Sequence, residues 1–336
     1  MTAFAKNYPM YAGAIVVAVC AARALGLAFG GVVRKMTMLQ AHVGGGVHGK
    51  TLDDAYTVAF MILSLFFARM ILTACLFGPL ADALSVVRKK RDSFLEMGWQ
   101  CVWYTLSFLA SMYFVAKEVG FDVDRCWVGQ NAPPAENPHV FVSAEFKAFY
   151  LLEIAFWVSM IISTPLAPRQ KDFPVMMAHH VVTSGLLIAS YRYNYMYIGV
   201  WVLFEQDFAD IFLPLAKMAK YSGMEAVADA FFGLFALAWI PTRHVMFFWL
   251  YHSIWSSTDV HADLLPLADS TKGGFFTKSS ISAFLVVLGL FQCLLLIWLR
   301  DLLKAVYRAL FKGSVEDHRS DSDSEGGTAA NAKKKE

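Results

Sequence analysis

Charged residues are scarce in this sequence. Asp, Glu, Lys and Arg make up 17% of the 336 residues, whereas hydrophobic residues make up 57%. Soluble domains carry about 25% charged residues and roughly 45–50% apolar residues. The composition therefore excludes a protein that is water-soluble throughout, and it excludes disorder except in local segments. An integral membrane protein remains.

Cysteine is also scarce, and so is any concentration of positive charge. Five cysteines are present, and four of them lie in apolar runs, which leaves Cys126 without a partner for a disulfide. This pattern excludes a secreted scaffold held together by disulfides. The net charge is only +2 and no basic domain stands out, so we expect no nucleic acid partner.

Apolar runs close to the length of a membrane span are abundant, and they predict transmembrane helices. We expect an all-α, polytopic transmembrane helical bundle with about seven or eight spans. The first run is interrupted by Arg23 and is also compatible with a cleavable signal peptide, which would leave the later spans in the same orientation. The predicted spans are 11–33, 55–77, 98–117, 146–165, 175–191, 195–216, 226–251 and 280–299.

Lys and Arg are unevenly shared between the segments that connect these spans. Segments rich in Lys and Arg face the cytosol. We therefore place 78–97, 166–174, 217–225 and the C-terminus in the cytosol, and the loops 118–145 and 252–279 in the lumen. The residues that decide this orientation are Arg88, Lys89, Lys90, Arg91, Arg169, Lys171, Lys217, Lys220, Arg300, Lys304, Arg308 and Lys312.

The C-terminal segment 313–336 is polar and of low complexity, and we expect it to be a disordered cytosolic tail. Ser320 and Ser322 each precede an acidic residue by three positions, a spacing that acid-directed kinases prefer, so we expect phosphorylation there. Lys333 and Lys334 form a dilysine pattern, which predicts retrieval to the endoplasmic reticulum. The alternative is a charge run that only aids solubility.

A glycine-rich segment, 44–51, fits the phosphate-loop pattern G-x-x-x-x-G-K-[ST]. That pattern binds phosphate where a buried strand precedes it and a helix follows it inside an α/β domain. Here it lies in a polar link between two predicted spans, on the predicted lumenal side. We therefore expect a flexible loop rather than a nucleotide site.

The fifth and sixth predicted spans carry ionisable side chains that lipid-facing helices avoid. A charge at the centre of a span costs about 2.5–3.5 kcal/mol on insertion scales, so such residues indicate function. The fifth span contains His179 and His180, and the sixth contains Asp207, Asp210 and, at its cytosolic end, Lys217. Asp207 and Asp210 are three residues apart, which places them on one helical face with Lys217.

The helical rise predicts that these side chains meet. At 1.5 Å per residue, the histidines and the aspartates lie roughly 10–15 Å from the cytosolic ends of two antiparallel spans. Arg69 falls at a similar depth, whereas we expect Arg243 nearer the lumen. The alternatives are a structural polar network and a metal site. Because adjacent histidines on one helix point about 100° apart, and no third histidine lies at this depth, we expect no metal.

An ordered set of polar and aromatic residues fills the stretch 169–221. Its members are Lys171, Asp172, Phe173, His179, His180, Val181, Val182, Thr183, Ser190, Tyr191, Asn194, Gly199, Asp207, Asp210, Leu213, Lys217 and Tyr221. This set resembles the Lag1 motif of ceramide synthases, within the TRAM–Lag1–CLN8 (TLC) superfamily. The flanking Arg69, Cys126-Trp127, Arg243 and the acidic serine tail also resemble that family, so the likeness covers about residues 53–325.

The sequence departs from the family pattern in places. Gln206 stands where many animal members have His, which excludes a mechanism with three histidines, although fungal members also lack that His. Pro214 stands where animal members often have Glu. No Asn-x-Ser/Thr sequon is present, so the N-glycosylation of some relatives is not expected.

The resemblance implies three regions. Residues 1–52 form an N-terminal hydrophobic segment (a signal anchor or extra span) with the glycine-rich loop. Residues 53–312 form the transmembrane catalytic domain with a TLC-type six-helix core, and residues 313–336 form the tail. The implied activity is that of a ceramide synthase in the endoplasmic reticulum membrane, which N-acylates a sphingoid base with a fatty acyl-CoA to give (dihydro)ceramide.

The resemblance also implies partners and roles for individual residues. The partners are fatty acyl-CoA, which is a co-substrate, a long-chain sphingoid base and the lipid bilayer, together with a homodimer or a heterodimer with another ceramide synthase. No cofactor is implied. The implied catalytic residues are His179, His180, Asp207 and Asp210. The implied substrate-binding residues are Arg69, Ser190, Tyr191, Asn194, Lys217 and Arg243, and the implied CoA-binding residues are Arg169, Lys171 and Lys220.

The residues allow two mechanisms for this reaction. An imidazole can act as a general base for the amine, or it can attack the thioester first to form an acyl-imidazole. An aspartate can hold the imidazole in place, and we expect Tyr191 and Asn194 to shape the lumenal end of the site instead. Two other functions stay open: a non-catalytic TLC protein that binds, senses or ferries lipid, and a proton-coupled transporter.

Overall fold

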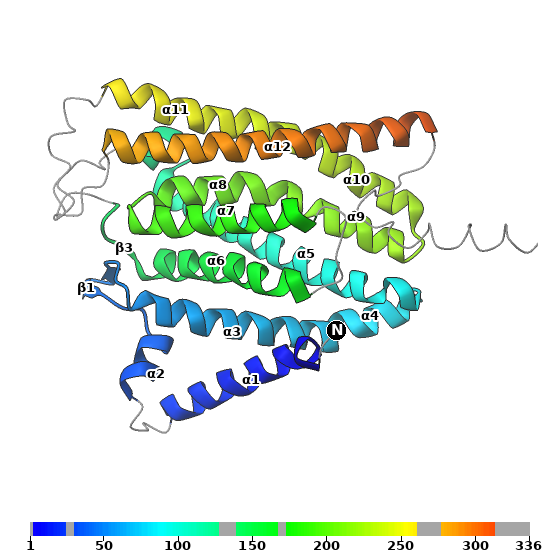
Figure 1. Ribbon diagram of the computed structural model, residues 1–336, viewed down its shortest axis with the longest axis horizontal. Helices are drawn as coiled ribbons and strands as arrows, with labels where there is room; N and C mark the ends of the chain where they lie inside the picture. The colour runs from blue at the N-terminus through cyan, green and yellow to red at the C-terminus, as the bar shows by residue number, and fades with distance from the viewer. Residues whose placement is uncertain (1–2, 25–29, 128–138, 167–172, 261–276, 313–336) are drawn as a thin grey trace, which may run out of the picture.

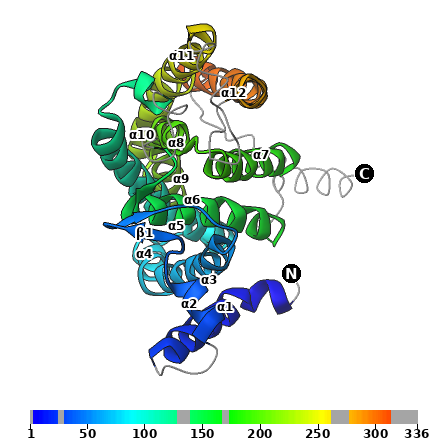
Figure 2. The same cartoon turned by 90° about the vertical axis from the view of Figure 1, so that its left-hand side faces the viewer.

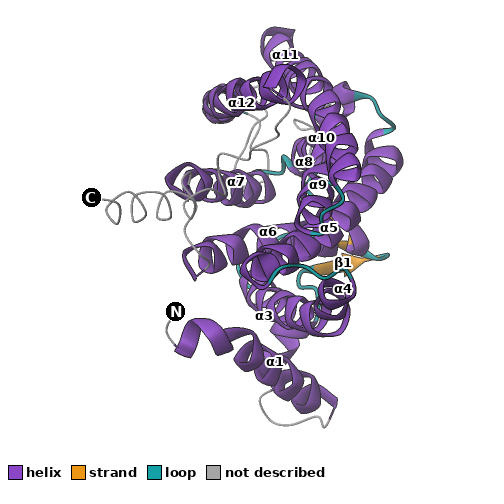
Figure 3. Ribbon diagram, turned by 90° about the vertical axis from the view of Figure 1, so that its right-hand side faces the viewer, coloured by secondary structure: helices purple, strands orange, loops and turns teal. Residues whose placement is uncertain are grey.

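The protein is a bundle of long helices, described by a computed structural model over residues 3–24, 30–127, 139–166, 173–260 and 277–312. Most of the long helices lie side by side along the longest axis of the molecule (Figure 1). Figure 3 shows how completely helix dominates the described residues, with one small sheet at one end of the bundle. The prediction of an all-α, polytopic membrane protein is confirmed.

The bundle is built from helices that carry mostly apolar residues. Those outside the first two, which are described below, are α3 (Asp54–Leu72), α4 (Gly78–Ala83), α5 (Arg88–Phe114), α6 (Ala144–Ser163), α7 (Phe173–Arg192), α8 (Met196–Asp210), α9 (Phe212–Tyr221), α10 (Glu225–Ile240), α11 (Phe247–Val260) and α12 (Lys278–Lys312). Short π-helical segments cover Thr73–Phe77, Val115–Val119 and Pro241–Met246, and short 3₁₀ turns cover Val123–Cys126 and Thr164–Leu166.

Five helical stretches in the described part of the chain are long and apolar enough to cross a membrane. They are Asp54–Ala83, Ala144–Leu166, Phe173–Arg192, Glu225–Ser256 and Lys278–Phe311. The predicted spans 98–117 and 195–216 are helical as well, but the second is divided between α8 and α9. The polytopic architecture follows from apolar runs alone, because each run is long enough to bridge the hydrocarbon core.

The predicted first span is wrong as a single helix. Residues 11–33 are shared between α1 (Ala3–Ala24) and the short α2 (Gly30–Thr37). Both lie at the edge of the bundle beside α3, far from α11 and α12 (Figures 1 and 2).

A three-stranded antiparallel sheet replaces the flexible loop expected at 44–51. Strand β1 (His42–Gly44) pairs with β2 (Val47–His48), and β2 pairs with β3 (Val142–Ser143), so that Val47 faces Ser143. Three consecutive glycines, 44–46, make the turn with positive φ, which side chains other than glycine rarely adopt. The expectation of a flexible loop is wrong. Because β2 lies inside the segment 44–51, this segment does not have the strand–loop–helix structure that a phosphate-binding loop requires.

Aromatic packing holds the central helices together. Trp103 of α5 stacks on Phe156 of α6 with ring centroids 4.1 Å apart, and Phe114 stacks on Phe149 between the same helices. Such contacts are stronger than the area they bury alone suggests. All five cysteines are free, as expected for a fold without disulfides.

Candidate active site

A cavity of about 270 Å³ opens between the central helices, and residues of α3, α5 to α10 and α12 line it. Its lining joins the ionisable residues of the predicted spans to a wall of apolar side chains. Arg69, His179, His180, Ser190, Asp207, Asp210, Lys217 and Arg243 all line it. The structure therefore brings together eight of the thirteen residues that the sequence indicated for catalysis, substrate binding or CoA binding.

The two histidines project from α7 and are surrounded by aromatic side chains. The ring of His179 lies against Trp157, Phe291 and Trp298, with centroids 5.3, 5.7 and 5.1 Å away, and its Nδ1 lies 3.4 Å from the Thr183 hydroxyl. The ring of His180 tilts against Trp157, and its Nδ1 is buried without a hydrogen-bond partner. A free ring nitrogen is what a base or nucleophile needs.

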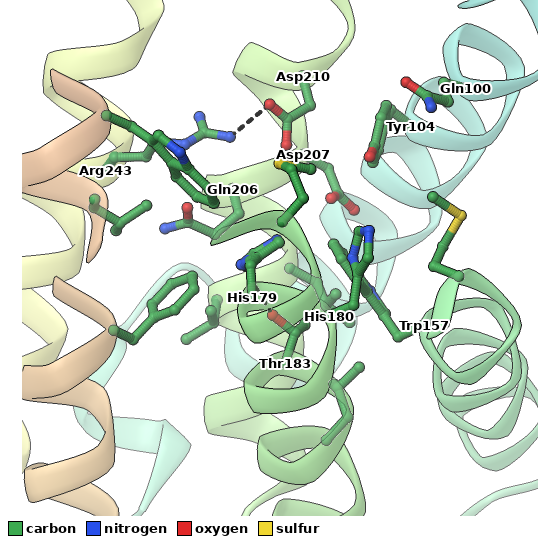
Figure 4. Close-up of a pocket in the computed structure, with 18 of the residues that line it drawn as sticks. Gln100, Tyr104, Trp157, His179, His180, Thr183, Gln206, Asp207, Asp210 and Arg243 are labelled. Carbon is green, nitrogen blue, oxygen red and sulfur yellow. Dashed lines mark hydrogen bonds and ion pairs between the residues drawn. The ribbon is translucent and has the colours of Figure 1, made fainter. Parts of the chain in front are cut away.

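The two aspartates of α8 have different surroundings. Asp210 forms an ion pair of 2.7 Å with Arg243, which lies over the ring of Trp239. Asp207 accepts a hydrogen bond from Ser107 of α5 and, among the described residues, forms no ion pair. Figure 4 shows its carboxylate directed toward the ring of His180. The arrangement leaves Asp207 as the carboxylate that can respond to a positive charge in the cavity.

One end of the cavity is polar. Arg69 of α3 pairs with Glu96 of α5, and Gln100 donates to the same carboxylate at 3.1 Å. Lys217 of α9 also lines the cavity, whereas Lys220 lies outside the lining. Arg169 and Lys171, which the sequence also indicated, lie outside the described residues. In the predicted orientation this end faces the cytosol, where CoA is found.

The opposite end of the cavity is closed by tightly packed side chains. The hydroxyl of Tyr150 on α6 hydrogen-bonds Ser190 on α7, and it presses against Gly199 of α8 so closely that a Cβ there would overlap it. Leu288 and Phe284 of α12 complete this end. A glycine at position 199 is therefore required for the three helices to meet as they do.

Tyr191 and Asn194 lie outside the cavity lining, in a separate polar group beside the sheet. The Tyr191 hydroxyl donates to Asp54 at 2.8 Å, and Asp54 forms an ion pair of 2.7 Å with the fully buried Lys147. Asn194 accepts a hydrogen bond from Lys50. We name Lys50, Asp54, Lys147, Tyr191 and Asn194 the sheet-side cluster. Its position accords with a role at the predicted lumenal end rather than in the chemistry.

One residue lies at a level that the sequence did not predict. Arg243 was expected nearer the lumen, but it reaches Asp210. Figure 1 shows that α10 is inclined to its neighbours, so counting residues along a straight axis misplaces Arg243. The π-helical segment Pro241–Met246 also changes the direction in which the side chain projects.

Several residues of the site carry no signal in the sequence. Trp157, Gln100 and Ser107 contact or line the histidine and aspartate group, yet an aromatic ring or a small polar side chain in an apolar run is ordinary. Only the fold brings them to the site. The described residues contain no group of three or more His, Cys, Asp and Glu side chains arranged to hold a metal ion.

Comparison with known proteins adds independent evidence. The family model described as the TLC domain (TRAM, LAG1 and CLN8) matches residues 93–304. The chain is 29% identical to sphingosine N-acyltransferase lag1 of Schizosaccharomyces pombe over 281 residues, covering 83% of this chain and 70% of the relative. It is 27% identical over 299 residues to ceramide synthase FUM18 of Gibberella moniliformis, covering 81% and 68%. It is 31% identical over 233 residues to ceramide synthase 4 of Mus musculus, covering 68% and 54%.

Proposed function

Because the chain belongs to the TLC-domain family, we propose that it is a ceramide synthase that transfers the acyl group of a fatty acyl-CoA to the amine of a sphingoid base. The observation that carries this proposal is the meeting of His179 and His180 with Asp207 and Asp210 in one buried cavity. That cavity has a polar end for CoA and apolar walls for hydrocarbon chains.

The proposed reaction makes an amide from a thioester. The amine attacks the thioester carbon, the C–N bond forms and the C–S bond breaks. A histidine takes the proton from the amine and passes it to the departing CoA thiolate, so the products are the N-acylated base and free CoA. In the alternative order, the histidine carries the acyl group as an acyl-imidazole before the amine accepts it. The acyl-CoA is already activated, so neither order needs a cofactor.

The histidine gains a positive charge when it takes up the proton, and Asp207 is placed to stabilise it. Its carboxylate is directed toward His180 and has no cation of its own among the described residues. An aspartate that holds an imidazole and its cationic form is a recurrent device in acyl transfer. Asp210, in contrast, is neutralised by Arg243, so we assign it to fixing the geometry.

Arg69 and Lys217 are the residues that we propose for the CoA end, together with Arg169, Lys171 and Lys220. We also propose that the protein acts in the endoplasmic reticulum membrane with a cytosolic C-terminus, as a homodimer or with another ceramide synthase. The excess of Lys and Arg in the predicted cytosolic segments and the dilysine pattern support this location.

The test is a turnover assay on purified protein in lipid nanodiscs. The protein receives sphinganine and a series of saturated acyl-CoAs, and the N-acyl product and the released thiol are measured. His179→Ala, His180→Ala and Asp207→Ala are compared with His252→Ala and Asp229→Ala, which alter exposed residues outside the cavity lining. We expect product from the wild type and the two controls, and loss of product from the other three variants.

Two outcomes would overturn the proposal. Product that survives all three cavity substitutions would show that the histidine and aspartate group is not the reaction centre. A folded wild-type protein that forms no product with any acyl-CoA would favour a non-catalytic TLC protein that binds lipid.

A further inference from the structure

Three helices form the closed end of the cavity. The Tyr150 hydroxyl of α6 hydrogen-bonds Ser190 of α7, and the Ser190 hydroxyl donates to the carbonyl of Leu187 at 2.9 Å. A Cβ at Gly199 of α8 would overlap the Tyr150 hydroxyl, so α6 and α8 are in close contact here. Ser190 and Gly199 line the cavity, and Tyr150 contacts both of them from outside the lining. We name Tyr150, Ser190 and Gly199 the cavity floor.

Aromatic rings are packed around the cavity floor. Tyr150 is fully buried, and its ring stacks on that of Tyr191 with centroids 6.2 Å apart. Phe284 of α12 lines the cavity, and its ring packs edge-on against Tyr195 with centroids 4.5 Å apart. The backbone N–H of Tyr195 in turn donates to the carbonyl of Ser190 at 2.7 Å, so Phe284 lies at the level of the floor. Because protein interiors are close-packed, a ligand that reaches this level stops there unless these side chains move.

The acyl chain of the substrate is the ligand that this end of the cavity fits. With CoA at the polar end and the thioester beside the histidines, the hydrocarbon chain has only the apolar part of the cavity to enter. Leu186, Leu187, Val202 and Leu288 line that part. Each methylene that enters leaves water, so a longer chain binds more favourably. That gain ends where the chain meets the cavity floor.

The helical rise converts the depth of the floor into a chain length. Ser190 follows His180 by ten residues, which corresponds to roughly 15 Å along α7. An extended hydrocarbon chain has C–C bonds of about 1.5 Å at near-tetrahedral angles and advances about 1.25 Å per carbon, so about 12 carbons fit in that depth. Side chains lean toward the N-terminus of their helix, so the His180 ring lies farther from the floor than its Cα does, which makes room for a few more carbons.

We propose that the cavity floor sets the upper length of the acyl group, so that the protein transfers chains of roughly 12 to 16 carbons and excludes chains of about 22 carbons or more. This inference rests on the proposed function. The selection is steric: a chain that is too long meets the floor while its thioester is still short of the histidines, where transfer is slow. Ser190, Gly199 and Phe284 contact only the methyl end of the chain, so they determine specificity and take no part in the chemistry.

A competition between chain lengths tests the proposal. Purified protein in nanodiscs receives sphinganine and an equimolar series of saturated acyl-CoAs, from octanoyl- to hexacosanoyl-CoA, and the N-acyl products are measured by mass spectrometry. We expect Tyr150→Leu and Phe284→Ala to raise the longest accepted chain by about two to four carbons, because each removes a ring at the floor. Leu187→Phe should lower it by about two carbons. The matched control Phe248→Ala removes an exposed ring of α11 outside the lining and should leave the limit unchanged.

Three results would overturn the proposal. The first is a wild type that transfers hexacosanoyl groups as readily as hexadecanoyl groups. The second is an unchanged limit in Phe284→Ala and Tyr150→Leu when thermal unfolding shows that they are folded; Phe284 is only partly buried, so its variant keeps the test available if Tyr150→Leu does not fold. The third is a shift in the preferred length of the sphingoid base instead, measured with one acyl-CoA and bases of graded length.

Binding of thioether analogues separates this inference from the proposed function. S-alkyl-CoA thioethers have no acyl group to transfer, so their affinity plotted against chain length measures the depth of the cavity without turnover. We expect affinity to rise with length up to the limit and then to fall, with the limit moved to longer chains in Tyr150→Leu and Phe284→Ala. A length limit in binding without any N-acyl product would support the floor and overturn the proposed function. Product formation with no length limit in either assay would overturn the floor and leave the proposed function standing.

Discussion

The cavity and the sheet-side cluster both bury polar side chains between helices, but they satisfy them differently. In the cluster, Lys147 is paired with Asp54 and also donates to two backbone carbonyls, and Lys50 donates to Asn194 and to the carbonyl of His139. Around the cavity, in contrast, polar atoms of several residues are buried without a partner. They belong to Trp157, His180, Ser184, Gln206, Trp239 and Arg243.

The difference distinguishes a structural network from a site. Native proteins pair nearly all buried polar groups, because an unpaired one costs about 1–3 kcal/mol. A cluster whose charges are paired stabilises the fold and has nothing left to offer a ligand. A cavity with several unpaired groups retains binding capacity for a substrate. Both regions lie along α7, so burial and polarity alone do not tell them apart.

The largest difference in activity between the two regions is expected from replacing one ring side chain in each of them. We expect His180→Gln to lower kcat by about 10⁴-fold, the upper end of what a general base contributes. Tyr191→Phe in the sheet-side cluster should retain wild-type activity per folded molecule. Acyl-CoA turnover measured beside thermal unfolding checks both. A Tyr191→Phe variant that folds normally but loses as much activity would remove the distinction.

Substitutions in the sheet-side cluster should instead lower the stability of the fold. Lys147→Met leaves the Asp54 carboxylate buried and unpaired, and breaking a buried ion pair from one side costs about 3–5 kcal/mol. We expect a lower unfolding temperature with unchanged kcat for the folded fraction. The double variant Lys147→Met/Asp54→Asn removes the stranded charge and should recover much of the loss. Additive losses in the double variant would contradict this account.

The ion pair between Arg243 and Asp210 lines the cavity, and we expect its loss to reduce activity less than the loss of His180 does. Arg243→Gln should lower kcat/KM by about 10- to 100-fold, because it removes the ion pair with Asp210 and disturbs the carboxylate group that faces the histidines. Arg243→Lys keeps the charge and should lose less. Kinetics of both variants, with Arg308→Gln on the end of α12 as a control, check this expectation. Equal losses for the Gln and Lys variants would show that the planar guanidinium rather than its charge matters.

The smallest expected effect is a dependence of stability on pH. Burial, with a smaller contribution from the charge of Lys147, lowers the pKa of Lys50 from its ordinary value to about 7. The unfolded chain therefore binds more protons than the folded one above pH 7, so stability rises with pH, by about 1 kcal/mol between pH 7 and pH 8. Unfolding temperatures across this range check it. Lys50→Met should flatten the rise, and an unchanged slope in that variant would assign the effect to another group.

The sequence was sufficient to predict the main features of the site. His179, His180, Asp207 and Asp210 stand out in apolar runs, and the fixed rise of a helix relates sequence position to depth. Their meeting in one cavity follows from two antiparallel spans. The helical, polytopic fold was equally accessible, because apolar runs of membrane-spanning length are typical of transmembrane helices.

The rest depended on contacts that no local pattern encodes. Ser107 and Asp207 are 100 residues apart in the chain, and a serine in an apolar run carries no indication of its partner. Arg243 was placed too near the lumen because the inclination of α10 is set by packing rather than by composition. The hairpin at 42–48 was missed because its register depends on pairing with β3.

The π-helical segment Pro241–Met246 has a further consequence for how this protein can change. Proline lacks the N–H that an α-helix needs, and a π-helical turn accommodates one extra residue. In a regular α-helix, one residue more or less would rotate everything beyond it by about 100° around the helix axis. Through this widened turn, a single-residue insertion or deletion could aim a different side chain at Asp210 while α10 and α11 keep their places in the bundle.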